Sequence, residues 1–150
     1  SRVQNEVGPI LEMIAKDITR GYGNANNPGV IVSAANMGEI RELDSAPTYD
    51  IFTDDPWVRY RYDSSAFSII KESCIGSQFA CSPWGAPEAL AKNISACNFT
   101  IALDDTLNKN LWVTVVITAR RNAADSSPPS ATNPEVVLQT TIAARSQSIH

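Results

Sequence analysis

The sequence predicts an α+β fold in which an N-terminal helix packs on an antiparallel β-sheet meander. Apolar residues recur at helical spacing near the N-terminus, whereas the second half of the chain contains several runs with the period-two alternation typical of strands. Short connections between consecutive strands favour antiparallel pairing, and the apolar face of such a sheet needs a cover that the helix can supply. With 150 residues, the chain is expected to form a single globular domain over residues 1–150.

The predicted helix covers residues 1–20. Pro9 lies inside the pattern and is expected either to kink the helix or to mark its true start. Gly21 is a natural residue to end it, because glycine is common just after helices. The apolar stripe of the helix consists of Val3, Val7, Ile10, Leu11, Ile14 and Ile18.

Residues 24–56 are predicted to form an irregular, variable region. The segment is rich in Asn, Pro, Gly and Asp, which favour turns. It has room for two short strands, at residues 30–34 and near residues 48–53. We expect it to carry surface loops.

Residues 57–145 are predicted to form the sheet. An alternating run at residues 57–63 and a second run at residues 66–72 predict a hairpin, since Asp63-Ser64-Ser65 favours a turn. A loop that contains Cys and Pro follows, and then a short helical turn or irregular segment at residues 88–94. The expected strands cover residues 57–63, 66–72, 97–103, 111–119 and 136–144.

The three cysteines predict one short disulfide and one buried thiol. Cys74 and Cys81 enclose six residues of a loop, and a bridge between them would stabilise the fold by about 2–3 kcal/mol. Cys97 shares a strand face with Phe99 and Ile101, which predicts a buried thiol. The pairings of Cys97 with Cys74 or with Cys81 stay open at this point. The spacing matches no zinc site, and a disulfide indicates an oxidising compartment.

Composition excludes several classes of function. Twelve Lys and Arg against sixteen Asp and Glu give a net charge of −4, which disfavours binding to nucleic acid or to an anionic membrane. The only histidine is His150, so a histidine-based triad, a histidine general base and a multi-histidine metal site are excluded. No apolar run reaches the roughly 18 residues of a transmembrane helix.

Candidate sites for chemistry or sugar binding have simpler interpretations. The pairs Asp54-Asp55 and Asp104-Asp105 are interpreted as solvated turn residues, because catalytic carboxylates must face each other and a calcium loop needs several oxygen ligands. Residues Trp57, Trp84 and Tyr49 could form an aromatic platform for sugar, but such residues more often pack in a core or a loop. We therefore predict no catalytic residues, no metal and no cofactor.

Six segments together resemble a known family. They are residues 13–23, which end in a Gly-Tyr-Gly turn, and residues 58–62, 67–72, 90–99, 113–117 and 138–145. In order and spacing they resemble the soluble part of minor type IV pilins and type II secretion minor pseudopilins, in the PilW-like and GspJ-like branches. The resemblance covers nearly the whole chain apart from residues 24–56.

The resemblance implies a non-enzymatic subunit that assembles with other major and minor pilins or pseudopilins. The favoured role is a minor pilin at the tip of a type IV pilus, which primes assembly or displays a head domain. The alternative within this class is a J-type minor pseudopilin of the type II secretion pseudopilus. An alternative of another class is a secreted carbohydrate-binding or adhesion module.

The resemblance also implies a membrane anchor that precedes residue 1. The chain begins with Ser1 and carries no cleavage site or apolar half-helix, so residues 1–20 are expected to be the C-terminal half of a longer helix. The full-length form would have a methylated N-terminus, an inner-membrane anchor and a periplasmic head, and would enter a surface pilus or periplasmic pseudopilus. Val3, Val7 and Glu6, near the free end of the helix, are the predicted partner-binding residues.

Overall fold

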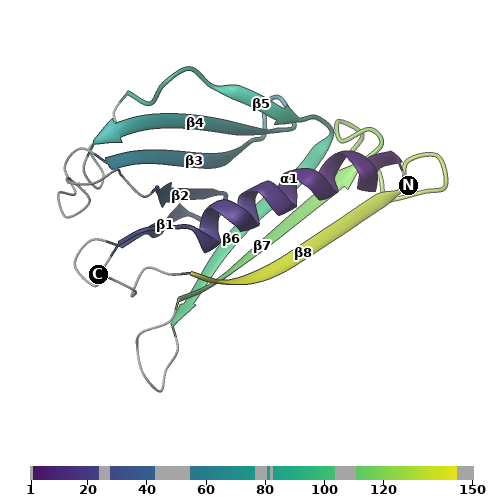
Figure 1. The fold of residues 1–150 in the computed structure, drawn as a ribbon. Coiled ribbons are helices and arrows are strands. Elements are labelled where there is room, and N and C mark those ends of the chain that lie inside the picture. The colour runs from purple at the N-terminus through teal and green to yellow at the C-terminus, as the bar shows by residue number, and fades with distance from the viewer. Residues whose placement is uncertain are drawn as a thin grey trace.

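The computed structural model describes residues 2–23, 28–42, 55–76, 81, 83–103 and 111–144. It contains one helix in this part of the chain, α1 (Arg2–Thr19), and two antiparallel sheets (Figure 1). The five-stranded sheet has the order β1 (Val30–Ala34), β2 (Met37–Arg41), β3 (Asp55–Asp63), β4 (Ser68–Gly76) and β5 (Glu88–Ala91). The three-stranded sheet consists of β6 (Ile94–Leu103), β7 (Leu111–Arg120) and β8 (Glu135–Ala144).

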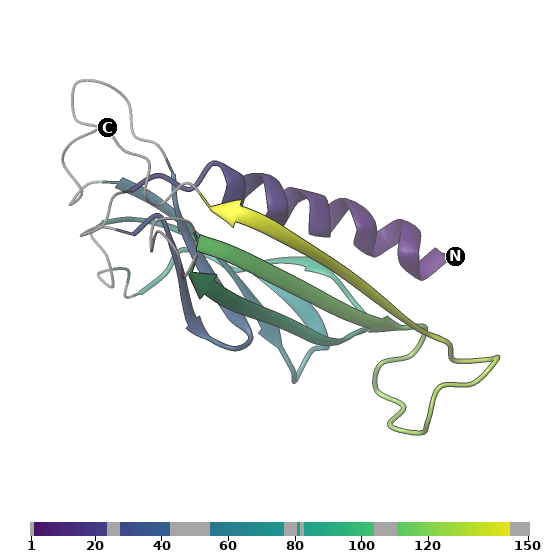
Figure 2. The same cartoon turned by 90° about the horizontal axis from the view of Figure 1, so that it is seen from below.

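The predicted fold class, one helix on a single antiparallel meander, is wrong. The described residues are mostly antiparallel strand, and they form two separate sheets. The helix packs on β8 and β7 of the three-stranded sheet, so the helix-on-sheet description fits only that part of the molecule. Figure 2 shows α1 lying along this sheet on one side.

Two strands were not expected. In β2, Gly38 interrupts the alternating pattern, so this strand gives a weak signal. Residues 88–94 were predicted to be helical or irregular because Glu, Ala and Leu favour helices. Pairing of this segment with β4, with Ala89 opposite Ile70, overrides that local preference and forms β5.

The strands predicted at residues 30–34, 57–63, 66–72, 97–103, 111–119 and 136–144 each correspond to a strand of the structure. The hairpin of β3 and β4 is paired from Asp55 to Asp63 without a bulge. At its turn, the Asp63 carboxylate accepts hydrogen bonds from the backbone N–H groups of Ser65 (3.0 Å) and Ala66 (3.4 Å), and Phe67 has a positive φ of 51°. The second strand expected in the variable region, near residues 48–53, lies outside the described residues.

The helix runs through Pro9 and begins at Arg2, so Pro9 is not its start. After the helix, Gly21 donates its N–H to the carbonyl of Ile18 (3.1 Å). Gly21 does not adopt a positive φ. Glycine is needed there because a Cβ would lie only 2.9 Å from Val30 Cγ2. No helix in the described ranges is long and apolar enough to span a membrane.

A single core joins the helix to both sheets. Phe99 of β6 lies against Gly38 of β2, where a Cβ would come within 2.9 Å of the phenyl ring, and the Phe99 N–H donates to the carbonyl of Ala35 (2.7 Å). These contacts connect the two sheets at β6. The core residues are Val7, Ile10, Ile14 and Ile18 of α1, Val30, Ile40, Val58, Tyr60 and Ile69 of the first sheet, and Ile94, Cys97, Phe99, Val113, Val115, Ile117 and Ala119 of the second.

Candidate functional site

The exposed face of α1 is the first candidate surface. The helix buries its apolar stripe in the chain's own core, including Val7, whose side chain is only 2% exposed. Val7, a predicted partner-binding residue, therefore packs inside its own subunit in this structure. The side chain of Val3, another such residue, lies outside the described part of the chain, whereas Glu6 is exposed. We call the exposed residues Glu6, Glu12, Lys16, Thr19 and Arg20 the outer face of α1.

Charge is distributed unevenly along this outer face. Glu6 lies in the N-terminal half of the helix and Glu12 just past its middle, whereas Lys16 and Arg20 lie at its C-terminal end. A shallow surface depression along the C-terminal half of the helix is lined by Glu12, Ala15, Lys16, Thr19 and Arg20. Along the outer face, acidic residues therefore precede basic ones.

The helix is fixed about its own axis by a hydrogen bond to the five-stranded sheet. The Tyr60 hydroxyl donates to the Asp17 carboxylate. Burial, reinforced by this negative partner, raises the pKa of Tyr60, so the phenol remains a donor across the physiological range. Burial and the charge of Asp17 also raise the pKa of Glu42 nearby. One flank of α1 thus faces the five-stranded sheet, and the opposite flank faces away from it.

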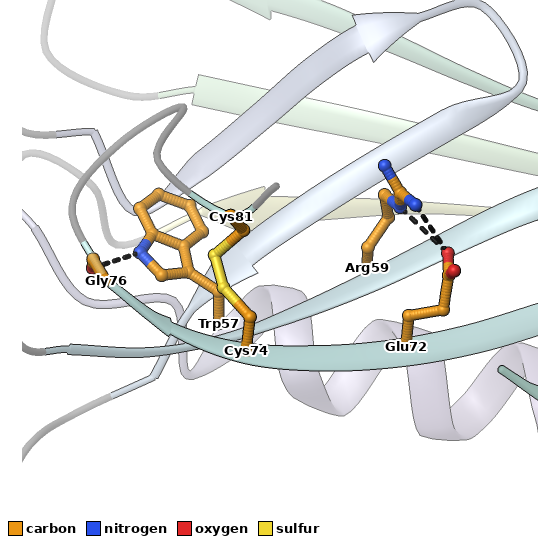
Figure 3. The surroundings of a disulfide bond; sticks show 6 residues. All are labelled: Trp57, Arg59, Glu72, Cys74, Gly76 and Cys81. Atoms are coloured by element: carbon orange, nitrogen blue, oxygen red, sulfur yellow. Dashed lines mark hydrogen bonds and ion pairs between the residues drawn. A yellow bond between two sulfur atoms is a disulfide. The ribbon is translucent and has the colours of Figure 1, made fainter. Parts of the chain in front are cut away.

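The disulfide-bonded end of β4 is the second candidate surface. The predicted bridge between Cys74 and Cys81 is confirmed, with 5.9 Å between the Cα atoms. Figure 3 shows the indole of Trp57 beside the bridge, and its Nε1–H donates to the carbonyl of Gly76 (3.0 Å). After the bridge, Gly85 donates its N–H to the carbonyl of Ser73 (2.9 Å), which leads the chain back along β4.

A group of charged side chains borders this disulfide loop. Arg59 donates from Nε (2.9 Å) and Nη2 (2.7 Å) to Glu72 Oε1, and Arg61 donates from Nε to the same oxygen (2.8 Å). Burial acts to raise the pKa of Glu72, but the hydrogen bonds from Arg61 and Arg59 outweigh it and the pKa is lowered. The guanidinium of Arg59 also stacks on Trp84, 4.5 Å from the ring centroid.

These contacts argue against the aromatic platform for sugar binding that was considered from the sequence. Trp57 is buried, with 2% of its surface exposed, and Trp84 is half-buried with Arg59 over its ring. Tyr49 lies outside the described residues. The two tryptophans therefore support the loop structurally, whereas Ile75, which is 76% exposed, is the most open apolar side chain at this end.

Asp55 does not lie in a solvated turn, which corrects the sequence interpretation. Its side chain is fully buried and pairs with the fully buried Arg41, with 3.3 Å between Nη1 and Oδ2. Burial lowers the pKa of Arg41, while Asp55 acts in the opposite direction. Arg41 also lies over Trp57, 4.7 Å from the ring centroid. Asp54 and the Asp104-Asp105 pair lie outside the described residues.

Cys97 lies in the core, as the sequence predicted. It is a free cysteine with 1% of its surface exposed, and burial raises its pKa to about 12. A protonated thiol without solvent access is a poor nucleophile, so this residue contributes to packing. Within the described ranges, no three or more His, Cys, Asp or Glu side chains gather as metal ligands would.

Comparison with known proteins identifies the fold. No family model matches the sequence, and no curated protein sequence matches it. Among solved structures, the chain is similar to a type IV-like pilin from Thermus thermophilus, with a TM-score of 0.54 and 11% sequence identity. The similarity covers 99% of this chain and 100% of that one. The chain therefore has a pilin-like fold.

Proposed function

We propose that this chain is the head of a type IV pilin-like subunit that works by assembling with other pilin subunits and not by catalysis. The observation that supports this most is the likeness over the whole chain to a type IV-like pilin, together with an N-terminal helix whose outer face stays exposed. The helix is held firmly by its own head through Asp17 and Tyr60, so it can carry the head as one body.

The outer face of α1 is the proposed contact surface for neighbouring subunits. In a bundle of parallel helices that are offset along their axis, Glu6 of one helix would lie beside the end of another that carries Lys16 and Arg20. Each exposed ion pair contributes only about 0.2–1 kcal/mol, so such pairs would set the offset between subunits more than the strength of the assembly. Glu6 is a proposed partner-binding residue on this surface. Val3 is also a proposed partner-binding residue.

Within this class we favour a minor pilin at the pilus tip, which primes assembly or displays the head. A J-type minor pseudopilin of a type II secretion system is the alternative. Either role includes an inner-membrane anchor preceding residue 1, a methylated N-terminus and a periplasmic head before assembly. A secreted carbohydrate-binding or adhesion module is less well supported, because Trp57 is buried and Trp84 is stacked against Arg59.

Deletion and complementation in the source organism test this proposal. Deleting the gene should reduce surface pili seen by electron microscopy, and the intact full-length gene should restore them. Lys16→Glu, which reverses a charge on the outer face, should restore fewer pili than the control Lys92→Glu, which reverses an exposed charge between β5 and β6.

The readouts separate the candidate roles. Normal pili with impaired export of secreted proteins would identify the pseudopilus role. Normal pili and normal export after deletion would refute the assembly function altogether, and binding on a glycan array would then favour the carbohydrate-binding alternative.

A further inference from the structure

One face of the three-stranded sheet points away from the helix and from the core. Side chains alternate between the two faces of a strand, and the buried Val113, Val115 and Ile117 of β7 lie on the face that packs against α1. The residues between them, with their partners in β6 and β8, lie on the opposite face. We call this the neutral face; it contains every second residue from 96 to 102, from 112 to 118 and from 137 to 143.

The neutral face carries no charged side chain, although 19% of the residues in the chain are charged. Charged residues are usually the commonest ones at exposed positions, and here hydroxyl, amide and apolar side chains take their place. An uncharged surface has no electrostatic attraction for nucleic acid, anionic lipid or charged peptides. The ligand whose charge matches this face is therefore a neutral molecule.

Trp112 stands open on the neutral face, with 43% of its surface exposed. The residues directly opposite it on the two neighbouring strands are Ala102 and Ala143, whose side chains are too small to cover an indole. The face of an aromatic ring is its negative side and attracts the weakly positive C–H groups of a molecule stacked on it. A sugar ring has such C–H groups on its flat side, so Trp112 offers a place for one sugar to stack.

Hydrogen-bonding side chains follow Trp112 in successive rows across the three strands. Thr100, Thr114 and Thr141 lie directly opposite one another, and the hydroxyl oxygens of Thr114 and Thr141 are 2.9 Å apart. The next row places the amides of Asn98 and Gln139 on the two outer strands. Neither these amides nor the Thr100 hydroxyl bonds to another described residue. Rows are about 7 Å apart, so a chain lying along the strands meets neutral donors and acceptors at regular intervals.

The apolar side chains of the neutral face do not form a continuous patch. Its large exposed apolar residues, among those described, are Trp112 and Val137. They lie about 20 Å apart along the strand direction, with the threonine row and the amide row between them. The centre of a protein–protein interface is apolar. This face therefore suits a ligand rich in hydroxyl groups better than it suits a protein.

We propose that the neutral face binds an extended, uncharged polysaccharide. One sugar stacks on Trp112, and the hydroxyl groups of the sugars that follow bond to the threonine row and to Asn98 and Gln139. An open sheet face with several rows suits a chain of sugars better than a single small sugar, which needs an enclosing pocket. Neither Trp57 nor Trp84, the tryptophans of the disulfide-bonded end, takes part.

The neutral face also stays accessible in the assembly proposed above. It lies on the opposite side of the three-stranded sheet from α1, as Figure 2 shows for the sheet and the helix. Contacts between subunits through the outer face of α1 would therefore leave it uncovered. The binding itself does not rest on assembly, since it concerns the isolated chain.

Sedimentation with insoluble polysaccharides tests the proposal. The isolated chain is mixed with particles of cellulose, chitin or mannan, which are uncharged, and with heparin-agarose as the anionic control. The fraction left in solution after centrifugation gives the affinity. We expect retention on at least one uncharged polysaccharide and weaker retention on heparin. Raising sodium chloride from about 0.05 M to about 0.5 M should not weaken the binding, because no ion pair contributes to it.

Four variants locate the binding surface. Trp112→Ala should weaken binding by about tenfold or more, since losing a central aromatic contact typically costs this much, and Trp112→Phe should keep part of the affinity. Gln139→Ala removes one amide from an exposed position and should weaken binding by about threefold. The matched control is Trp84→Ala, which removes an indole at the disulfide loop and should leave the binding unchanged.

Three outcomes would overturn the proposal. One is a chain that is retained on none of the three uncharged polysaccharides. Another is a Trp112→Ala variant, folded by circular dichroism, that binds as tightly as the wild type; if this variant does not fold, unchanged binding by Gln139→Ala has the same meaning. The third is tighter retention on heparin-agarose than on the uncharged polysaccharides. None of these results bears on the assembly function, which is tested separately by counting pili.

Discussion

Replacing Asp55 with alanine is expected to destabilise this fold far more than a surface substitution. The side chains of Asp55 and Arg41 are both 0% exposed, and Nη1 and Oδ2 lie 3.3 Å apart. Removing the carboxylate takes this ion pair away from a guanidinium that stays buried over Trp57. Breaking a buried pair in this way costs about 3–5 kcal/mol, a large share of the roughly 5–15 kcal/mol that stabilises a typical domain.

Urea unfolding followed by circular dichroism measures this loss at neutral pH. A loss of this size corresponds to a melting temperature lower by about 6–20 °C for a chain of this length. The double variant Arg41→Met with Asp55→Ala should recover much of the loss, because removing both buried charges is often nearly neutral. Glu135→Ala, at an exposed position, is the matched control and should change stability by less than about 0.5 kcal/mol.

Two results would refute this reasoning. A loss below about 1 kcal/mol for Asp55→Ala would place the pair among ordinary surface ion pairs. A double variant as unstable as the single one would mean that the shape of the two side chains, and not their buried charges, determines the effect.

Three further outcomes are expected. Without reductant, a thiol reagent should find no rapidly reacting group in the native chain and one after denaturation, since Cys97 is buried with a pKa of about 12; three thiols without reductant would contradict the bridge. Gly38→Ala should cost about 1–3 kcal/mol in urea unfolding, because its Cβ would lie 2.9 Å from the Phe99 ring; an unchanged midpoint would contradict this. The pKa of Glu72 is lowered in the folded chain, so its hydrogen bonds stabilise fully above the ordinary carboxyl pKa and are lost as the pH falls through the lowered value. Glu72→Gln should therefore flatten the acid side of a plot of unfolding midpoint against pH, and an unaltered slope would exclude this residue as the cause.

Local patterns were sufficient for the features that depend on neighbours in sequence. The alternation of residues 57–62 predicted the hairpin, the spacing from Val7 to Ile18 predicted the helix, and the short separation of Cys74 and Cys81 predicted their bridge. In each case the information lies within a few residues of the feature.

Features that depend on distant contacts were missed. Gly38 weakens the alternating pattern of its strand. Glycine is needed there because the ring of Phe99 from the other sheet occupies the space of a side chain. Asp55 follows another aspartate at the end of a loop-rich segment, and only the fold places Arg41 against it in a dry environment. The division into two sheets also depends on tertiary packing, which alternation along a single strand does not encode.

The side-by-side course of α1 and β8 has a mechanical consequence. A pull along the helix axis would load its contacts with β8 in shear, so that many side chains would have to slide at once and not separate one after another. The hydrogen bond from Tyr60 to Asp17 adds a link between the helix and the five-stranded sheet. Through this link, part of the tension on the helix would reach the five-stranded sheet.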